Sequence, residues 1–156
     1  MFIKIISAIL ISISTFSASV ATAQEKPMRL ESAVQLLKPA DESGGEPALL
    51  DAKNVVPGDT LVFTTSFRNQ GSAAINDFVI VNPVPADVVL ADEPAADAQV
   101  SVDGAKTWGQ LAELIIIESS GEQRAATISD ITHLRWTFSR VPSGETGRVQ
   151  FSANVR

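Results

Sequence analysis

The fold is decided by two stretches near the C-terminus, HLRWTF at residues 133–138 and RVQFSANV at residues 148–155. In both stretches apolar and polar residues alternate. Leu134, Trp136 and Phe138 fall on one face of the first, and their polar neighbours fall on the other. Successive side chains of a β-strand point to opposite faces, so a period of two predicts strands with one buried face.

Three further segments extend this pattern toward the N-terminus. Residues 60–68 place apolar side chains on one face, with Val62 as the exception, and residues 100–103 alternate valine with polar residues. The segment FVIV at residues 78–81 is apolar on both faces. A strand covered on both faces is a continuous apolar run, so we expect residues 78–81 to form a central or doubly covered strand.

Turn-forming residues separate the expected strands. They occur as PGD (57–59), NQGS (69–72), NPVP (82–85), DG (103–104), SSGE (119–122) and PSG (142–144). Glycine, proline and asparagine at such positions adopt turn conformations or interrupt a hydrogen-bond ladder. Short strands at regular spacing, bounded by these turns, predict an all-β sandwich or barrel.

Three segments are less clear-cut. Residues 28–38 fit either a strand or a short helix. We favour the strand, because a single helix would have little to pack against in an all-β chain. Residues 39–47 are rich in glycine, proline and acid and are expected to form a loop. Within residues 108–118 the β-branched run predicts a strand that ends near Glu118.

The N-terminus has the layout of a secretory signal peptide. Lys4 supplies a positive charge, residues 5–20 are apolar but interrupted by serine and threonine, and Ala21-Thr22-Ala23 offers a cleavage site. A membrane-spanning helix needs about 20 predominantly apolar residues, which favours cleavage after Ala23 over a retained anchor. We therefore expect a periplasmic or secreted protein with no stable membrane insertion after cleavage. Residues 1–23 are the predicted signal peptide.

Composition limits the possible functions. The predicted mature chain loses one basic residue, Lys4, so its formal net charge becomes 11 − 18 = −7. Such a surface repels nucleic acid, and we expect no nucleic-acid partner. The chain contains no cysteine, which excludes disulfides, thiol nucleophiles and cysteine-ligated metals. An exported protein without disulfides is ordinary in a bacterial periplasm.

The residues that could carry chemistry form no recognisable motif. His133 is the single histidine, and alternation places it opposite Leu134 and Trp136, where we expect it to face solvent. No G-x-S-x-G nucleophile motif is present, and a zinc site would lack its usual ligands. We predict no catalytic, cofactor-binding or metal-binding residues, no cofactor and no enzymatic activity.

Charged residues suggest only weak alternatives. Two groups of carboxylates could bind calcium, but neither follows the alternating acidic pattern of a calcium loop. These groups are Asp41, Glu42 and Glu46, and Asp87, Asp92, Glu93 and Asp97. Arg135, Arg148 and Arg156 could share an outward face, which we interpret as paired surface charge.

A family resemblance extends this interpretation. The segment VPGDTLVF (56–63), followed by RNQG (68–71) and DFVIVNPVP (77–85), resembles the bacterial conserved-repeat domain of unknown function, often called DUF11. Residues 101–104, 107–108, 134–136 and 144–151 resemble its second half, so the likeness covers roughly residues 54–156. The chain departs from common members because it carries one copy, with Asn82-Pro83 where many have an acidic residue.

The resemblance implies an immunoglobulin-like antiparallel β-sandwich and no catalytic residues. It also implies structural roles: Gly58 and Gly71 in turns that a side chain would strain, Asn69 bonding its own turn backbone, and Trp136 in the core. Residues 24–53 would add an N-terminal strand and an acidic Gly/Pro loop to the same domain.

The expected function is a non-catalytic protein-interaction module, which holds an unidentified protein partner of the cell envelope through an edge strand or end loops. The alternative is a structural component of a cell-envelope or surface assembly. Small-ligand or calcium binding is a weaker alternative. The expected function rests on analogy between folds.

Overall fold

The computed structural model describes residues 27–40 and 46–156, so the predicted signal peptide, Asp41 and Glu42 lie outside the described residues. Within these ranges the chain forms ten strands and two short 3₁₀ helices. The strands are β1 (Met28–Lys38), β2 (Ala48–Asp51), β3 (Thr60–Asn69), β4 (Ile75–Pro83), β5 (Val88–Leu90), β6 (Ala98–Ser101), β7 (Ile115–Ile117), β8 (Gln123–Ala125), β9 (His133–Val141) and β10 (Thr146–Val155). The helices are η1 (Leu111–Glu113) and η2 (Ile128–Asp130).

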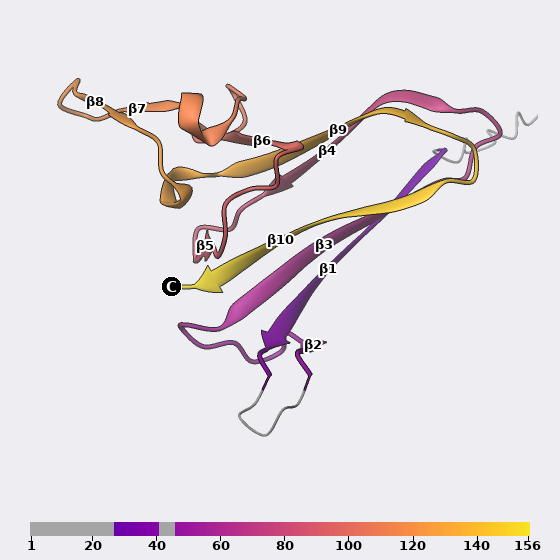
Figure 1. The fold of residues 1–156 in the computed structure, drawn as a ribbon, viewed down its shortest axis with the longest axis horizontal. Coiled ribbons are helices and arrows are strands. Elements are labelled where there is room, and N and C mark those ends of the chain that lie inside the picture. The colour runs from indigo at the N-terminus through magenta and orange to yellow at the C-terminus, as the bar shows by residue number, and fades with distance from the viewer. Residues whose placement is uncertain (1–26, 41–45) are drawn as a thin grey trace, which may run out of the picture.

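The strands form two packed sheets and a separate hairpin (Figure 1). One sheet has five strands in the order β2-β1-β3-β10-β5, and the other has three in the order β4-β9-β6. Strands β7 and β8 pair only with each other. Every strand pair is antiparallel. The prediction of an all-β antiparallel sandwich is therefore confirmed.

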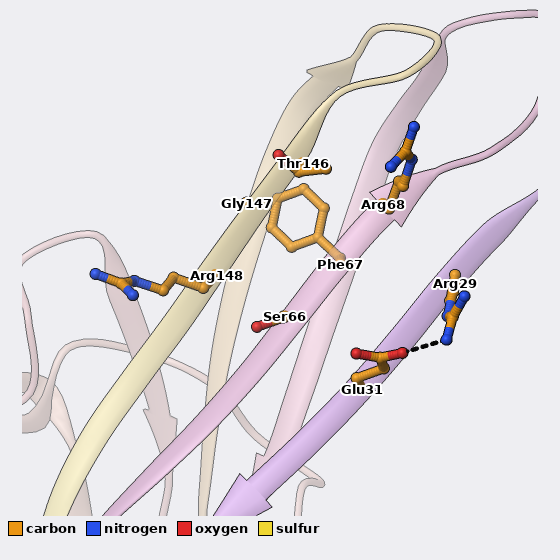
Figure 2. Close-up of a pocket in the computed structure, with 8 residues that line it drawn as sticks. All are labelled: Arg29, Glu31, Ser66, Phe67, Arg68, Thr146, Gly147 and Arg148. Carbon is orange, nitrogen blue, oxygen red and sulfur yellow. Dashed lines mark ion pairs between the residues drawn. The ribbon is translucent and has the colours of Figure 1, made fainter. Parts of the chain in front are cut away.

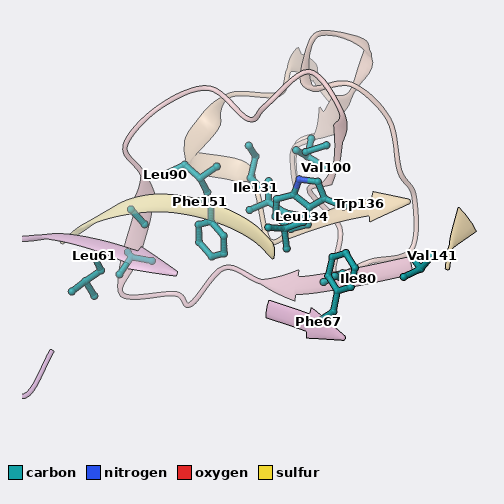
Figure 3. Close-up of a cluster of buried hydrophobic side chains, with 14 residues drawn as sticks. Leu61, Phe67, Ile80, Leu90, Val100, Ile131, Leu134, Trp136, Val141 and Phe151 are labelled. Atoms are coloured by element: carbon teal, nitrogen blue, oxygen red, sulfur yellow. The ribbon is translucent and has the colours of Figure 1, made fainter. Parts of the chain in front are cut away.

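The core lies between the two sheets, where the inward residues of each strand meet (Figure 3). Trp136 is 4% exposed, which confirms its predicted place in the core. The Phe67 ring of β3 packs against Phe78 of β4 and Phe138 of β9, with centroids 5.5 and 4.8 Å apart. Aromatic contacts of this kind add to the burial of apolar area that stabilises a sandwich.

Asn69 links the two sheets at one end of the molecule. Its buried side-chain amide donates to the carbonyl oxygens of Ala73, Val141 and Pro142, at 2.8, 3.0 and 3.1 Å. Its side-chain oxygen accepts from the Gly71 N–H at 3.0 Å. The expected bond from Asn69 to its own turn is confirmed, and the same side chain also holds the β9–β10 turn.

The two glycines singled out in the sequence are constrained for different reasons. Gly58 has φ +94°, a conformation that side chains rarely adopt. Gly71 has no such φ, but a Cβ there would lie 2.9 Å from the Pro27 Cβ. In both places a side chain would strain the turn, as expected.

The segments that the sequence left uncertain are now assigned. Residues 28–38 form strand β1, as favoured, and strand β7 ends at Ile117, next to the predicted end at Glu118. The prediction that residues 78–81 form a central or doubly covered strand is wrong. Strand β4 is an edge strand, and its outward Val79 and Val81 are 44% and 43% exposed.

Candidate interaction surface

The two sides of the sandwich differ in how their edge strands are paired. At one side β5 and β6 end the two sheets, and β6 is bridged further by Gly109, which exchanges backbone hydrogen bonds with Val100 at 2.9 and 3.1 Å. At the other side, within the described ranges, no strand pairs with the outer edge of β4, and β2 pairs with β1 only at Gln35–Lys38. Backbone groups of β1 and β4 therefore remain available at this second side.

The pairing with β9 determines which groups of β4 face outward. Val100 of β6 exchanges both of its backbone hydrogen bonds with Gly109, so its pairing with Leu134 of β9 is a non-hydrogen-bonded pair. Hydrogen-bonded and non-bonded pairs alternate along an antiparallel ladder, so Leu134 and Trp136 turn their backbone groups toward β4. Ile80, which pairs with Trp136, therefore bonds β9, whereas Val79 and Val81 turn their N–H and C=O groups away from it.

The free edge of β4 is short and limited at both ends. Asp77 and Ser139, which lie opposite each other, are left out of the β4–β9 ladder although the register continues on both sides, and Asp77 has a φ of 51°, so the strand is distorted there. Pro83 has no N–H to offer. A distorted residue at one end and a proline at the other restrict the pairing of this edge strand. They leave the stretch between them, with its two outward valines, as the part of β4 that can accept another strand.

The inner face of β1 is uncovered beside this edge. Strand β4 lies over β3, because Phe78 packs on Phe67 and the Thr65 hydroxyl donates to the Asn82 side chain at 3.1 Å. β1 lies beyond β3 and has no strand above it within the described residues. The inward-facing Leu30 and Val34 of β1 are consequently 52% and 43% exposed.

We call this region the open side: the outer edge of β4 with Val79 and Val81, and the uncovered inner residues of β1 and β2, which are Leu30, Val34 and Leu50. It combines unpaired backbone groups with apolar side chains. Backbone groups recognise an extended strand, and alternate side chains give that recognition its specificity. No other described surface combines both features over two sheets.

The outer face of the three-stranded sheet carries His133, but no catalytic constellation. The guanidinium of Arg135 stacks 4.5 Å from the centroid of the Trp108 ring and donates to the Gln99 side chain. His133 lies opposite the buried Leu134, as predicted, yet it is half-buried, and its Nδ1 lies 3.0 Å from the Thr132 hydroxyl. No carboxylate in the described chain bonds it, so an oriented acid–base pair is missing.

The outer face of the five-stranded sheet holds a shallow pocket of about 520 Å³ (Figure 2). Arg29, Arg68 and Arg148 line it, and Glu31 forms an ion pair with Arg29. In Figure 2 the side chains of Arg68 and Arg148 point away from each other rather than toward a shared ligand position. The arrangement does not converge on an anion.

This placement corrects one expectation about the basic residues. Arg135, Arg148 and Arg156 do not share one outward face, since Arg135 belongs to β9 and Arg148 to β10, in opposite sheets. Sequence alternation gives the face of a strand but not the sheet to which that strand belongs.

The acidic residues that the structure describes form no cluster that could hold a metal ion. Among the described residues no three His, Cys, Asp or Glu side chains gather as a metal site would require. Asp87, Asp92, Glu93 and Asp97 are exposed in loops, as is Glu46. Every buried side-chain nitrogen or oxygen of the described chain has a hydrogen-bond partner, so none is left to receive a ligand.

The carboxylates with shifted pKa values serve loop structure. Hydrogen bonds from Thr107 and Ser101 hold the pKa of Asp103 well below its ordinary range. The Arg124 guanidinium does the same for the pKa of Asp130, which it contacts at 2.6 and 2.7 Å. Both groups brace turns, and neither faces a cleft with a nucleophile, which is where a shifted pKa would indicate catalysis.

Comparison with known proteins identifies no relative: no family model, curated protein or solved structure matches the chain. The resemblance to the conserved-repeat domain stays a prediction. The described part of the chain also contains no helix with the length and hydrophobicity needed to span a bilayer.

Proposed function

We propose that this protein is an exported, non-catalytic interaction module that holds a protein partner by accepting a strand at the open side. The observation that carries the proposal is the edge of β4, where Val79 and Val81 turn their backbone groups outward beside the uncovered Leu30 and Val34. An added strand would pair with β4 and cover the inner face of β1. The signal-peptide pattern at residues 1–23 supports a periplasmic or secreted location.

Catalysis receives no support from the same surfaces. An enzyme needs a nucleophile or acid–base pair at hydrogen-bond distance, directed toward a space for substrate. The described pockets are lined by sheet and loop residues without such a pair, and among the described side chains the half-buried His133 hydrogen-bonds only Thr132. The immunoglobulin-like topology is part of the proposal, since it would explain why the edges and loops carry the function.

The test is site-specific photo-crosslinking in the native cell envelope, with the full chain expressed from its own N-terminus. A photoreactive residue at Val81 is expected to capture a protein partner, whereas one at Gln150, on the polar outer face of the five-stranded sheet, is not. Equal labelling from both positions would contradict a role for the open side.

A proline variant identifies the mode of binding. Val81→Pro removes an outward N–H without breaking a bond to β9, and proline is tolerated on edge strands. With the photoreactive residue moved to position 79, the other outward position of β4, Val81→Pro is expected to reduce partner capture at least tenfold. Val81→Thr retains the N–H and the β-branched shape and is the matched control. Equal capture by the two variants would show that the partner does not pair with the backbone of β4.

A further inference from the structure

The hairpin formed by β7 and β8 exposes an unusual amount of apolar side chain. Ile115 and Ile117 are 54% and 67% exposed and lie on one face of the hairpin. Figure 1 shows the hairpin extending away from the two main sheets, on the far side of β9 from β1. The two isoleucines therefore cannot reach the open side of their own chain.

The hairpin is nevertheless held in a fixed position. Arg124, which points to the opposite face from Ile115 and Ile117, donates to Glu118 at 2.6 Å and forms two bonds to Asp130 of η2. The pair with Glu118 braces the hairpin internally, and the two bonds to Asp130 connect β8 to η2. An apolar strand that is already ordered loses less conformational entropy on docking than a flexible one.

The open side has the width of a hairpin. The five-stranded sheet exceeds the three-stranded sheet by two strands, and the placement of β4 over β3 puts both extra strands, β1 and β2, on the open side. Two further strands next to β4 would lie over β1 and β2 and complete the second layer. A two-stranded hairpin supplies that number.

The side chains of β7 also match those of the open side. A strand next to β4 would meet Leu30 and Val34 on its inner face and would flank Val79 and Val81 on its outer face. Such a strand needs apolar residues on both faces. Strand β7 is Ile-Ile-Ile, so successive isoleucines can serve both, and β-branched pairs across neighbouring strands are favourable.

A symmetric pairing of two β4 edges fits less well. If the β4 edges of two copies paired antiparallel about a twofold axis perpendicular to the sheets, strand β3 of the second copy would lie beneath β4 of the second copy. That position is already filled by β1 of the first copy. The hairpin has no second sheet stacked behind it, so it can enter where a whole sandwich edge cannot.

We propose that the open side receives the β7–β8 hairpin of a second copy of this chain, with β7 beside β4. The inference rests on the proposed function, because it names the strand that the open side accepts. The two contact surfaces are different parts of the molecule, so the contact is head-to-tail. Repeated contacts of this kind build a ring or a filament, which agrees with the alternative of a structural component in an envelope assembly.

The absence of cysteine allows a direct test. Neighbouring strands bring paired Cα atoms within disulfide distance. We would prepare Val79→Cys, Val81→Cys and Ile116→Cys variants of the full chain, mix each edge variant with the hairpin variant, and oxidise. At least one edge variant is expected to form a mixed disulfide with the hairpin variant several times faster than either variant pairs with itself. Gln150→Cys is the control that should not cross-link.

A second measurement does not depend on engineered thiols. Sedimentation velocity of the unmodified chain is expected to show concentration-dependent association, which the double variant Ile115→Thr, Ile117→Thr should weaken at least tenfold. Both isoleucines are exposed, so the variant should fold normally, and its circular dichroism and thermal midpoint would verify this.

The possible outcomes separate this inference from the proposed function. A Val81→Cys self-disulfide would overturn the hairpin in favour of an edge-to-edge dimer. A chain that stays monomeric without mixed disulfides would also overturn it. If photo-crosslinking at Val81 still captured a different protein, the proposed function would stand without the inference. If Val81 captured nothing, both would fail.

Discussion

The sandwich has a closed side, formed by β5, β6 and η2, and an open side, formed by β1 and β4. Both sides follow the same pattern of alternating residues, but their inward residues differ in burial. On the closed side the inward residues Leu90 and Val100 are 5% and 1% exposed. On the open side the inward Leu30 and Val34 are about half exposed. All four are large aliphatic residues on the inner face of a strand.

The difference lies in what stands opposite each strand. The closed side has a strand in both layers and a further bridge from Gly109, whereas β1 and β2 have no strand above them within the described chain. An inward apolar residue is thus buried only if the other sheet reaches it. Full burial of a leucine or valine stabilises by about 1.5–3 kcal/mol, and the open side leaves part of this stabilisation unrealised.

The largest expected effect comes from truncating equivalent leucines on the two sides. Leu90→Ala, at a residue 5% exposed on the closed side, should destabilise the fold by about 2–5 kcal/mol, because it leaves a cavity. Leu30→Ala should cost below about 1 kcal/mol, because water already reaches the side chain. Urea unfolding of both variants measures the difference. Similar losses at the two positions would mean that the open side is covered in the isolated protein.

Sequence patterns predicted the strands well because a period of two is a local property. They identified β3, β9 and β10, and also the turn at Asn69, where a short side chain bonds nearby backbone. They failed for residues 78–81, where an apolar run on both faces suggested a covered strand. The run has the same composition whether a strand is covered or stands at the edge of its sheet.

The candidate site could not be predicted from sequence, since it depends on how strands are ordered within sheets. Nothing local to residues 28–38 shows that β1 extends beyond β4, or that β2 covers only its last few residues. The one available signal was the paired valines at positions 79 and 81, which were interpreted as buried. Strand order is set by contacts between residues far apart in the chain, and alternation carries no information about them.

A smaller effect is expected at the end where the sheets are joined. Asn69→Ala would leave buried carbonyl groups and the Gly71 N–H without a partner, at a cost of about 1–3 kcal/mol. Because Asn69 ties the β3–β4 turn to the β9–β10 turn, its loss should also increase hydrogen exchange in both turns. Gln70→Ala, at the exposed neighbouring position, is the matched control. An unchanged unfolding midpoint for Asn69→Ala would show that packing alone holds the two sheets together.

The smallest effect concerns the attachment of the β7–β8 hairpin. Arg124 lowers the pKa of Asp130 below its ordinary value of 3.8, so the folded state favours the ionised carboxylate. The attachment is therefore complete above about pH 4 and is lost as the pH falls through the lowered pKa. Hydrogen exchange of the β7 amides relative to the core should stay constant between pH 5 and 8, once corrected for its intrinsic pH dependence, and should rise only in stronger acid.

The variant Arg124→Gln should raise the exchange rate of the β7 amides at neutral pH. It should change the thermal midpoint little, because exposed ion pairs stabilise weakly. If β7 exchange were the same in Arg124→Gln and the unmodified chain, the hairpin would owe its order to the backbone alone, and its readiness to dock would not depend on this ion pair.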